Sequence, residues 1–159
     1  MPGPPSAPHS PWPFGGYRLL AGTPLAELAP SADPAPAQAA LAHQLGDFLG
    51  ALHALPLDLA PSLAPDTLGR LDVARRRPIT LASLATCGAS DARAEALLDD
   101  AVGAAATHAP RLVITHADLD ARHVLVDDTR RATGVIDWGD LMLADPAIDL
   151  GLAFSAFDG

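Results

Sequence analysis

Four side chains in the last third of the sequence are of the types that transfer phosphoryl groups or bind metal ions. They are His116, Asp118, His123 and Asp137. Phosphoryl transfer from a nucleotide needs one carboxylate to orient or deprotonate the attacking hydroxyl, and further ligands to hold Mg²⁺ against the phosphate oxygens. Mg²⁺ prefers oxygen ligands and is usually held by one or two carboxylates and several waters. Asp118 and Asp137 fit these two roles.

Short apolar runs of the β type alternate with polar residues around these side chains. The runs are 112–114, 124–126 and 135–136. Strand ends hold side chains at fixed places, and loops let them converge. We therefore predict strand, loop, strand, tight turn and strand, with the four side chains gathered at one edge. The turn, expected at 127–134, would bring Asp118 and Asp137 together across one cleft.

Apolar residues at helical spacing predict the elements that support this edge. A helix over 37–55 carries one apolar stripe and is ended by Pro56. The stripe consists of Leu41, Leu45, Phe48, Leu49 and Leu52. His53, near the end of this helix, is expected to pack or to cap the helix rather than to catalyse.

Two more helices are expected on either side of the strand region. The first covers 90–107 and packs through Leu97, Leu98, Ala101 and Val102. The second follows Asp145, which can cap it, with Pro146 in its first turn. Trp138, between the last strand and this helix, is expected in the core, where it shapes the turn after Asp137.

The first third of the chain is divided by proline and glycine. Residues 1–13 hold six prolines, so we expect a flexible lead-in ahead of one domain over 14–159. A short strand is expected over 14–20, ended by the Gly-Thr-Pro sequence at 22–24. The three adjacent arginines at 75–77 are expected on a solvated face.

Composition excludes several classes of function. The formal net charge is −9 at pH 7, which argues against nucleic acids and anionic membranes as partners. Cys87 is the only cysteine, so no internal disulfide forms, and we see neither a signal peptide nor a membrane span. We therefore expect a cytoplasmic protein, whose oligomeric state the sequence leaves open. All ten basic residues are arginine.

Three segments, in this order along the sequence, resemble the catalytic core of the aminoglycoside phosphotransferase family, which shares the protein-kinase-like fold. They are 116–127, 134–140 and 145–149. The likeness is specific in this block and weaker before it, where 14–25 and the helix ending at Leu55 are similar to the family's hinge and first C-lobe helix. The resemblance implies an α+β fold, a kinase-like C-lobe that is mostly helical with a small β-hairpin region at the catalytic edge.

The resemblance also implies roles for individual residues. Asp118 matches the catalytic aspartate that accepts the proton of the substrate hydroxyl, and Asp137 matches the metal-binding aspartate. His116 matches the histidine that braces the active-site backbone. Asp149 matches a buried aspartate expected to hold the catalytic loop by hydrogen bonds. Positions implied to bind the nucleotide are Leu20, Ala21, Gly22 and Ile136.

The sequence departs from the family pattern in three respects. Ala117 stands where the family usually has glycine, which is tolerable unless φ is positive there. His123 replaces the usual metal-binding asparagine, so either it binds through nitrogen, which would favour Mn²⁺, or it has left the metal shell. The chain also lacks lysine and a G-x-G-x-x-G phosphate loop, so we expect a partial C-lobe that begins at the hinge, without the N-lobe.

Three functions fit these observations. The first is a piece of a phosphotransferase that uses ATP or GTP and Mg²⁺ to phosphorylate a hydroxyl of an aminoglycoside-like or other small molecule, and that is inactive as this chain alone. The second is a catalytically inactive kinase-like remnant or binding module. The third, less favoured, is a metallohydrolase built on His116, Asp118 and His123, which would need no nucleotide.

Overall fold

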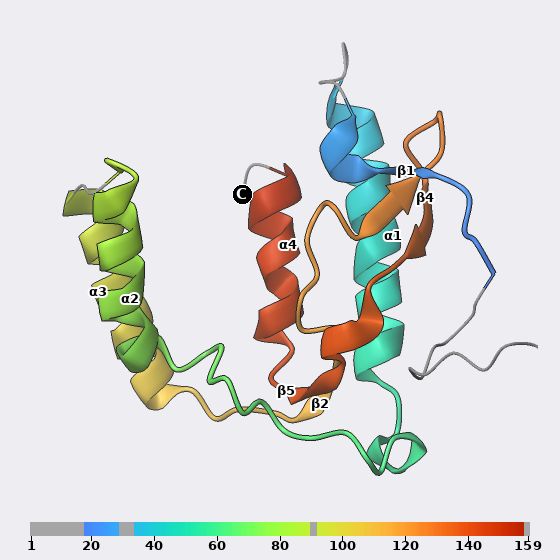
Figure 1. The fold of residues 1–159 in the computed structure, drawn as a ribbon. Coiled ribbons are helices and arrows are strands. Elements are labelled where there is room, and N and C mark those ends of the chain that lie inside the picture. The colour runs from blue at the N-terminus through green and yellow to red at the C-terminus, as the bar shows by residue number, and fades with distance from the viewer. Residues whose placement is uncertain (1–17, 29–33, 90–91, 158–159) are drawn as a thin grey trace, which may run out of the picture.

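The computed structural model describes residues 18–28, 34–89 and 92–157. Four α-helices account for most of the described residues that lie in helices or strands (Figure 1). They are α1 (Pro34–His53), α2 (Val73–Thr86), α3 (Ala92–Thr107) and α4 (Ala147–Phe157). None of the described helices is long and apolar enough to cross a lipid bilayer. The fold is therefore mixed but mainly helical, as the sequence predicts.

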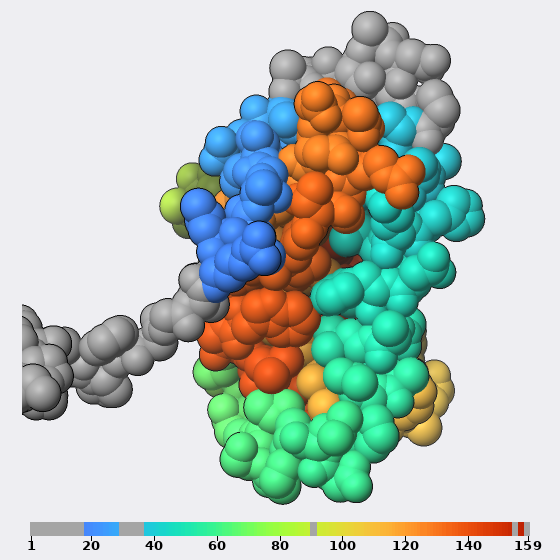
Figure 2. Space-filling view, turned by 90° about the vertical axis from the view of Figure 1, so that its right-hand side faces the viewer, coloured from blue at the N-terminus to red at the C-terminus, as the bar shows by residue number. Residues whose placement is uncertain are grey.

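The strands form two small antiparallel sheets. The first has the order β1 (Thr23–Pro24), β3 (Val124–Val126), β4 (Ala132–Val135), and the second pairs β2 (Val113–Thr115) with β5 (Met142–Ala144). Figure 2 shows the N-terminal segment, in blue, lying against the orange strand region to which β1 belongs. Three short 3₁₀ helices complete the described elements. They are η1 (Leu25–Glu27), η2 (Leu57–Leu59) and η3 (Trp138–Asp140).

The core lies between α1, α4 and the strands. The leucines of the predicted α1 stripe are buried, and Phe48 packs beside them in a partly buried position. The buried cluster consists of Leu41, Leu45, Leu49, Leu52, Ile114, Leu119, Val124, Val126 and Leu152. All three residues of β2 and of β3 are buried. The loops that leave these two strands are therefore anchored on the most buried part of the molecule.

Several expected boundaries are wrong in detail. The turn after β3 is shorter than expected, because Asp127 accepts hydrogen bonds from the backbone of Thr129 and Arg131 and closes it within a few residues. The predicted strand over 14–20 is not present at 18–20, and 14–17 lie outside the described residues, as does the lead-in at 1–13. The strand that forms is β1, at the sequence expected to end it; Pro24 fits there because β1 pairs on one side only.

Besides β1 and the three 3₁₀ helices, sequence reasoning missed two elements. The first is β5, a strand of three residues with no alternating pattern long enough to identify it. The second is α2, where the arginines at 75–77 are exposed or half-buried as expected but sit in a helix that begins at the Asp72 cap and tolerates Pro78 in its second turn.

The helix α3 forms where it was predicted, but of the four residues expected to pack, only Leu98, Ala101 and Val102 are half-buried. Leu97 is 59 % exposed, and no described residue of α2 or α3 is buried. Figure 1 shows α2 and α3 side by side and apart from the other helices. The apolar periodicity of α3 therefore faces α2 and solvent rather than the core.

Candidate active site

The candidate site begins with the loop that leaves β2. His116 and Ala117 are buried, Asp118 is exposed, and Leu119 returns to the core. Because the neighbours of Asp118 on both sides are held inside, the loop has little freedom to move its tip. The structure thus presents one carboxylate to solvent from a backbone that is fixed in the interior.

Asp149 fixes this loop from the side of α4. Its side chain is fully buried and accepts hydrogen bonds from the backbone N–H groups of Ala117 (2.8 Å) and His116 (3.1 Å). The ring of His53, at the end of α1, lies 2.8 Å from the same carboxylate through its Nε2. One buried carboxylate therefore ties two helices to the loop that carries Asp118.

His53 is a residue whose place in the site the sequence did not reveal. Its partner is 96 residues away, so no local pattern could name the pair. A weak signal was present, because His53 continues the four-residue spacing of Leu41, Leu45 and Leu49 and so falls on the buried side of α1. A histidine on an apolar stripe needs a polar partner, and Asp149 supplies it.

The backbone at Ala117 is strained. Its φ is +68°, in the left-handed region that side chains other than glycine avoid. The expectation that alanine is tolerated at this position holds only for a φ that is not positive. Since φ is positive, the condition is not met. The two hydrogen bonds to Asp149 hold the chain in this conformation, so part of their energy offsets the strain.

His116 braces the loop against the strand that leads to Asp137. Its Nε2 donates to the backbone oxygen of Ile136 at 2.9 Å, and its ring lies 4.7 Å from that of Trp138 between centroids. Trp138 is not the core residue that the sequence predicts, since it is 38 % exposed. It sits in the surface 3₁₀ helix η3, donates through Nε1 to the oxygen of Val135 and meets Phe48 edge-on.

His123 connects the two predicted acids. Its Nδ1 lies 2.6 Å from the backbone oxygen of Asp118, and its Nε2 lies 3.4 Å from Oδ2 of Asp137. The ring stacks on that of His116, with 5.9 Å between centroids and 27° between the ring planes. Three of the side chains that the sequence singled out, those of His116, His123 and Asp137, are therefore in contact, and the fourth residue, Asp118, joins them through its backbone oxygen.

Asp137 follows β4 with φ +64°, and its side chain is 62 % exposed. The negative charges of Asp137 and Asp118 both act on the guanidinium of Arg122. The hydrogen bond and charge of Asp120 raise the pKa of Arg122 most, with smaller contributions from Asp118 and Asp137. The same ion pair holds the pKa of Asp120 below its usual range. The arginine thus offsets part of the negative charge at this edge.

Two adjoining cavities, of 540 and 500 Å³, lie beside Asp137. Both are lined by Leu20, Ile136 and Asp137, and the second also by Gly22. Ala21 does not line either cavity; its backbone oxygen accepts a hydrogen bond from Thr133. Three of the four positions implied to bind a nucleotide therefore surround the cavities next to the candidate metal ligand.

Glycine is required at position 22. Its φ is +140°, and a Cβ there would lie 2.5 Å from Oγ1 of Thr133. A side chain would push the N-terminal segment away from β4. The close approach of this segment to the sheet, visible in Figure 2, is what closes one wall of the second cavity.

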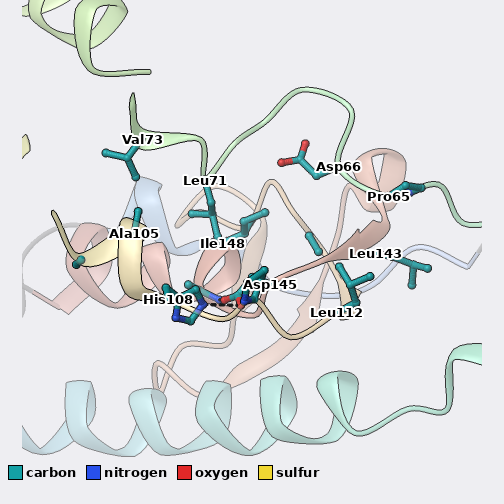
Figure 3. A pocket seen from close by; sticks show the side chains of 14 residues that line it. Pro65, Asp66, Leu71, Val73, Ala105, His108, Leu112, Leu143, Asp145 and Ile148 are labelled. Carbon is teal, nitrogen blue, oxygen red and sulfur yellow. Dashed lines mark hydrogen bonds and ion pairs between the residues drawn. The ribbon is translucent and has the colours of Figure 1, made fainter. Parts of the chain in front are cut away.

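A third cavity, of 530 Å³, lies between the α2–α3 pair and α4 (Figure 3). Its lining is mainly apolar, and Nε2 of His108, one of the lining residues, lies 2.8 Å from the carboxylate of Asp145, which accepts the hydrogen bond. Burial raises the pKa of Asp145, but hydrogen bonds from the backbone of Ala147, from His108 and from the backbone of Arg111 outweigh it, so the pKa is lowered. Asp145 therefore caps α4 as expected, and also joins the end of α3 to it.

Comparison with known proteins adds an independent observation. The phosphotransferase enzyme family matches residues 5–159. A macrolide 2'-phosphotransferase type I has a similar structure, with a TM-score of 0.60 and 24% identity over 90% of this chain and 49% of that one. Macrolide 2'-phosphotransferase MphH from Brachybacterium faecium is 30% identical over 84% of this chain and 46% of its own, with a TM-score of 0.53.

Two further relatives differ in how much of the chain they match. The GDP and kanamycin complex of APH(2")-IIia is 23% identical, with a TM-score of 0.55 over 88% of this chain and 50% of that one. The uncharacterized protein YcbJ of Bacillus subtilis (strain 168) is 41% identical over 44 residues, which are 28% of this chain and 14% of that protein. The chain spans about half the length of the solved relatives it matches.

Proposed function

The chain belongs to the phosphotransferase enzyme family, and we propose that it carries the part of such an enzyme that activates the acceptor and binds the metal. The reaction is transfer of the terminal phosphoryl group of ATP or GTP to a hydroxyl of a small molecule. One observation carries the proposal: Asp118 is held at the tip of a loop fixed by Asp149, and His123 joins its backbone to Asp137.

Asp118 is the residue that receives the acceptor. Its carboxylate is exposed while the adjoining backbone is buried, so a substrate hydroxyl can reach it without moving the loop. A carboxylate at hydrogen-bond distance orients the hydroxyl and accepts its proton as the bond to phosphorus forms. Asp149, His116 and His53 act as positioning residues, since they hold the loop and do not face the solvent.

Asp137 and His123 are the residues that would hold the divalent cation. Two protein ligands suit such an ion, because the other positions are taken by water and phosphate oxygens. The cation would neutralise charge on the phosphate oxygens. Among the described residues, no group of three or more His, Cys, Asp or Glu side chains could hold a metal, so the proposed centre depends on the nucleotide for further ligands.

The nucleotide would occupy the cavities lined by Leu20, Gly22 and Ile136, beside Asp137. Apolar walls next to a metal ligand suit a base at one end and phosphates at the other. One related protein, APH(2")-IIia, has a structure in complex with GDP and kanamycin. For this chain we propose a nucleoside triphosphate and a hydroxylated small molecule.

Full transfer needs more than this chain supplies. The sequence has no lysine to pair with the phosphates, and it spans about half of the solved relatives. We therefore expect transfer only from a fusion protein, in which this chain is joined to the part of a full-length relative that has no counterpart in it. Nucleotide binding by this chain alone should still be measurable.

Calorimetry with ATP and GTP, with and without Mg²⁺, tests the proposal. Asp118→Asn should leave nucleotide affinity within about twofold and abolish transfer in the fused protein, because Asp118 meets the acceptor and not the nucleotide. Asp137→Asn should remove the metal-dependent part of binding. Asp99→Asn, on the exposed face of α3, is the matched control and should change neither.

The two alternatives predict other results. Nucleotide binding without transfer in the fused protein, for every acceptor tried, would favour a binding module. Hydrolysis without nucleotide would favour a metallohydrolase. Full transfer by Asp118→Asn would remove Asp118 from its proposed role.

A further inference from the structure

The imidazole of His123 has one nitrogen committed to the protein. Nδ1 lies 2.6 Å from the backbone oxygen of Asp118. A carbonyl oxygen can only accept, so Nδ1 carries the hydrogen of this bond. In the neutral ring the other nitrogen, Nε2, then has a lone pair and no hydrogen. The tautomer is therefore set by the loop that carries Asp118.

The lone pair of Nε2 faces a second acceptor. Oδ2 of Asp137 lies 3.4 Å away, whereas a direct bond between a charged N–H and a carboxylate is about 2.7–2.9 Å long. The separation is thus longer than that of a close ion pair. Two acceptors that face each other are compatible when a cation lies between them.

The separation suits two ligands of one cation. Nitrogen and carboxylate oxygen ligands lie about 2.0–2.2 Å from a small divalent ion, so two ligands at right angles are about 3 Å apart. Asp137 is 62 % exposed on its side chain and can adjust by the few tenths of an ångström that remain. His123 cannot, because it is 9 % exposed and its ring stacks on that of His116.

The surroundings of His123 also match those of histidine ligands in general. Histidines that bind metals usually donate the other ring N–H to a backbone carbonyl or a carboxylate, which fixes the ring and makes the free nitrogen more basic. Here the backbone oxygen of Asp118 is that partner. The ring is thus prepared for a metal ion on its Nε2 side without any change of rotamer.

We propose that His123 ligates, through Nε2, the same divalent cation as Asp137, and that this nitrogen ligand makes the centre select first-row transition ions over Mg²⁺. The affinity order is Mg²⁺ below Mn²⁺ below Co²⁺, because imidazole strengthens binding along the transition series while Mg²⁺ gains little from nitrogen. The inference rests on the proposed function for the role of Asp137. The cation's remaining positions are left to water and phosphate oxygens, since only these two protein ligands converge among the described residues.

Pulsed electron paramagnetic resonance of the chain with Mn²⁺ alone, and with Mn²⁺ and ADP, is the test. The expected result is nitrogen coupling to the bound ion that is lost in His123→Asn, where an amide oxygen replaces the nitrogen. His43→Asn is the matched control, because His43 is exposed on α1 and far from the strand edge in sequence, and it should keep the coupling. Circular dichroism of each variant establishes that it is folded.

Calorimetric titration with MgCl₂, MnCl₂ and CoCl₂ gives the second readout. The ratio of Mn²⁺ to Mg²⁺ affinity should fall by about tenfold or more in His123→Asn. Mn²⁺ bound without nitrogen coupling, coupling that survives His123→Asn, or equal affinity ratios in both proteins would overturn the inference. Failure of transfer in the fused protein, with coupling intact, would overturn the proposed function and leave this metal centre standing.

Discussion

Two parts of the molecule use helices in opposite ways. Around the candidate site, α1 and α4 bury a leucine stripe and a carboxylate against the strands. In the hairpin formed by α2 and α3, no described residue is buried, and the two helices lie apart from the rest of the molecule (Figure 1). Helices of similar length thus serve as a scaffold in one part and as an exposed pair in the other.

The polar contacts differ in the same way. Asp149 is fully buried and accepts hydrogen bonds from the buried backbone of a loop distant in sequence, and it also contacts the half-buried ring of His53. The ion pair of the hairpin, Arg77 with Asp99, is exposed, so solvent screens it. A charged group fixes the geometry of its partners mainly where water is excluded, and in this chain that holds at the loop carrying Asp118.

The largest expected effect is the loss of Asp149. Asp149→Ala leaves two buried backbone N–H groups and His53 without a partner, which should cost about 3–5 kcal/mol of the free energy of unfolding. Asp149→Asn keeps the shape and should cost less. Urea denaturation measures both.

The counterpart in the hairpin is Asp99→Asn. It should leave the denaturation midpoint unchanged, because its ion pair is exposed. If Asp99→Asn and Asp149→Asn lowered the free energy of unfolding equally, the contrast between the two regions would be wrong.

A matched pair of leucines tests packing alone. Leu45 is 3% exposed on α1 and Leu97 is 59% exposed on α3. Leu45→Ala should destabilise the protein by about 2–5 kcal/mol, and Leu97→Ala by no more than about 0.5 kcal/mol. Thermal unfolding gives the comparison, and a large cost at Leu97 would mean that the hairpin is packed in solution.

A pair of alanine-to-glycine changes should have opposite signs. Ala117→Gly relieves the left-handed backbone and should stabilise the protein by about 1 kcal/mol. Ala96→Gly, in the exposed middle of α3, should destabilise it by about 0.5–1 kcal/mol. Chemical denaturation of both variants decides the matter, and destabilisation by Ala117→Gly would show that the methyl group packs better than the strain costs.

The smallest effect is expected where the two regions meet, at Asp145. Its lowered pKa means that the folded state favours the carboxylate, so this contribution is complete at neutral pH and is lost as the pH falls below about 4. Asp145→Asn keeps a helix-capping side chain and removes that titration. Its stability should therefore fall less steeply than that of the unchanged protein as the pH is lowered below about 4, and equal slopes of stability against pH in the two proteins would contradict this.

The sequence predicted the elements around the candidate site better than the hairpin. The apolar stripe of α1 and the short runs around His116 and Asp137 are local patterns, and the matching elements form. In the hairpin, α2 was missed, and Leu97, which was expected to pack, is exposed. A periodic apolar pattern indicates a helix, but it does not identify the surface that covers it.

The sequence by itself determined which residue types stand at the candidate site and the order in which they occur, because strand ends and loops are written in local patterns. Only the tertiary structure decided that His53 meets Asp149, that Ala117 has a positive φ, and that Nε2 of His123 faces Asp137. These features depend on side chains brought together from distant segments by burial, and contacts of that kind leave no spacing in the sequence from which they could be read.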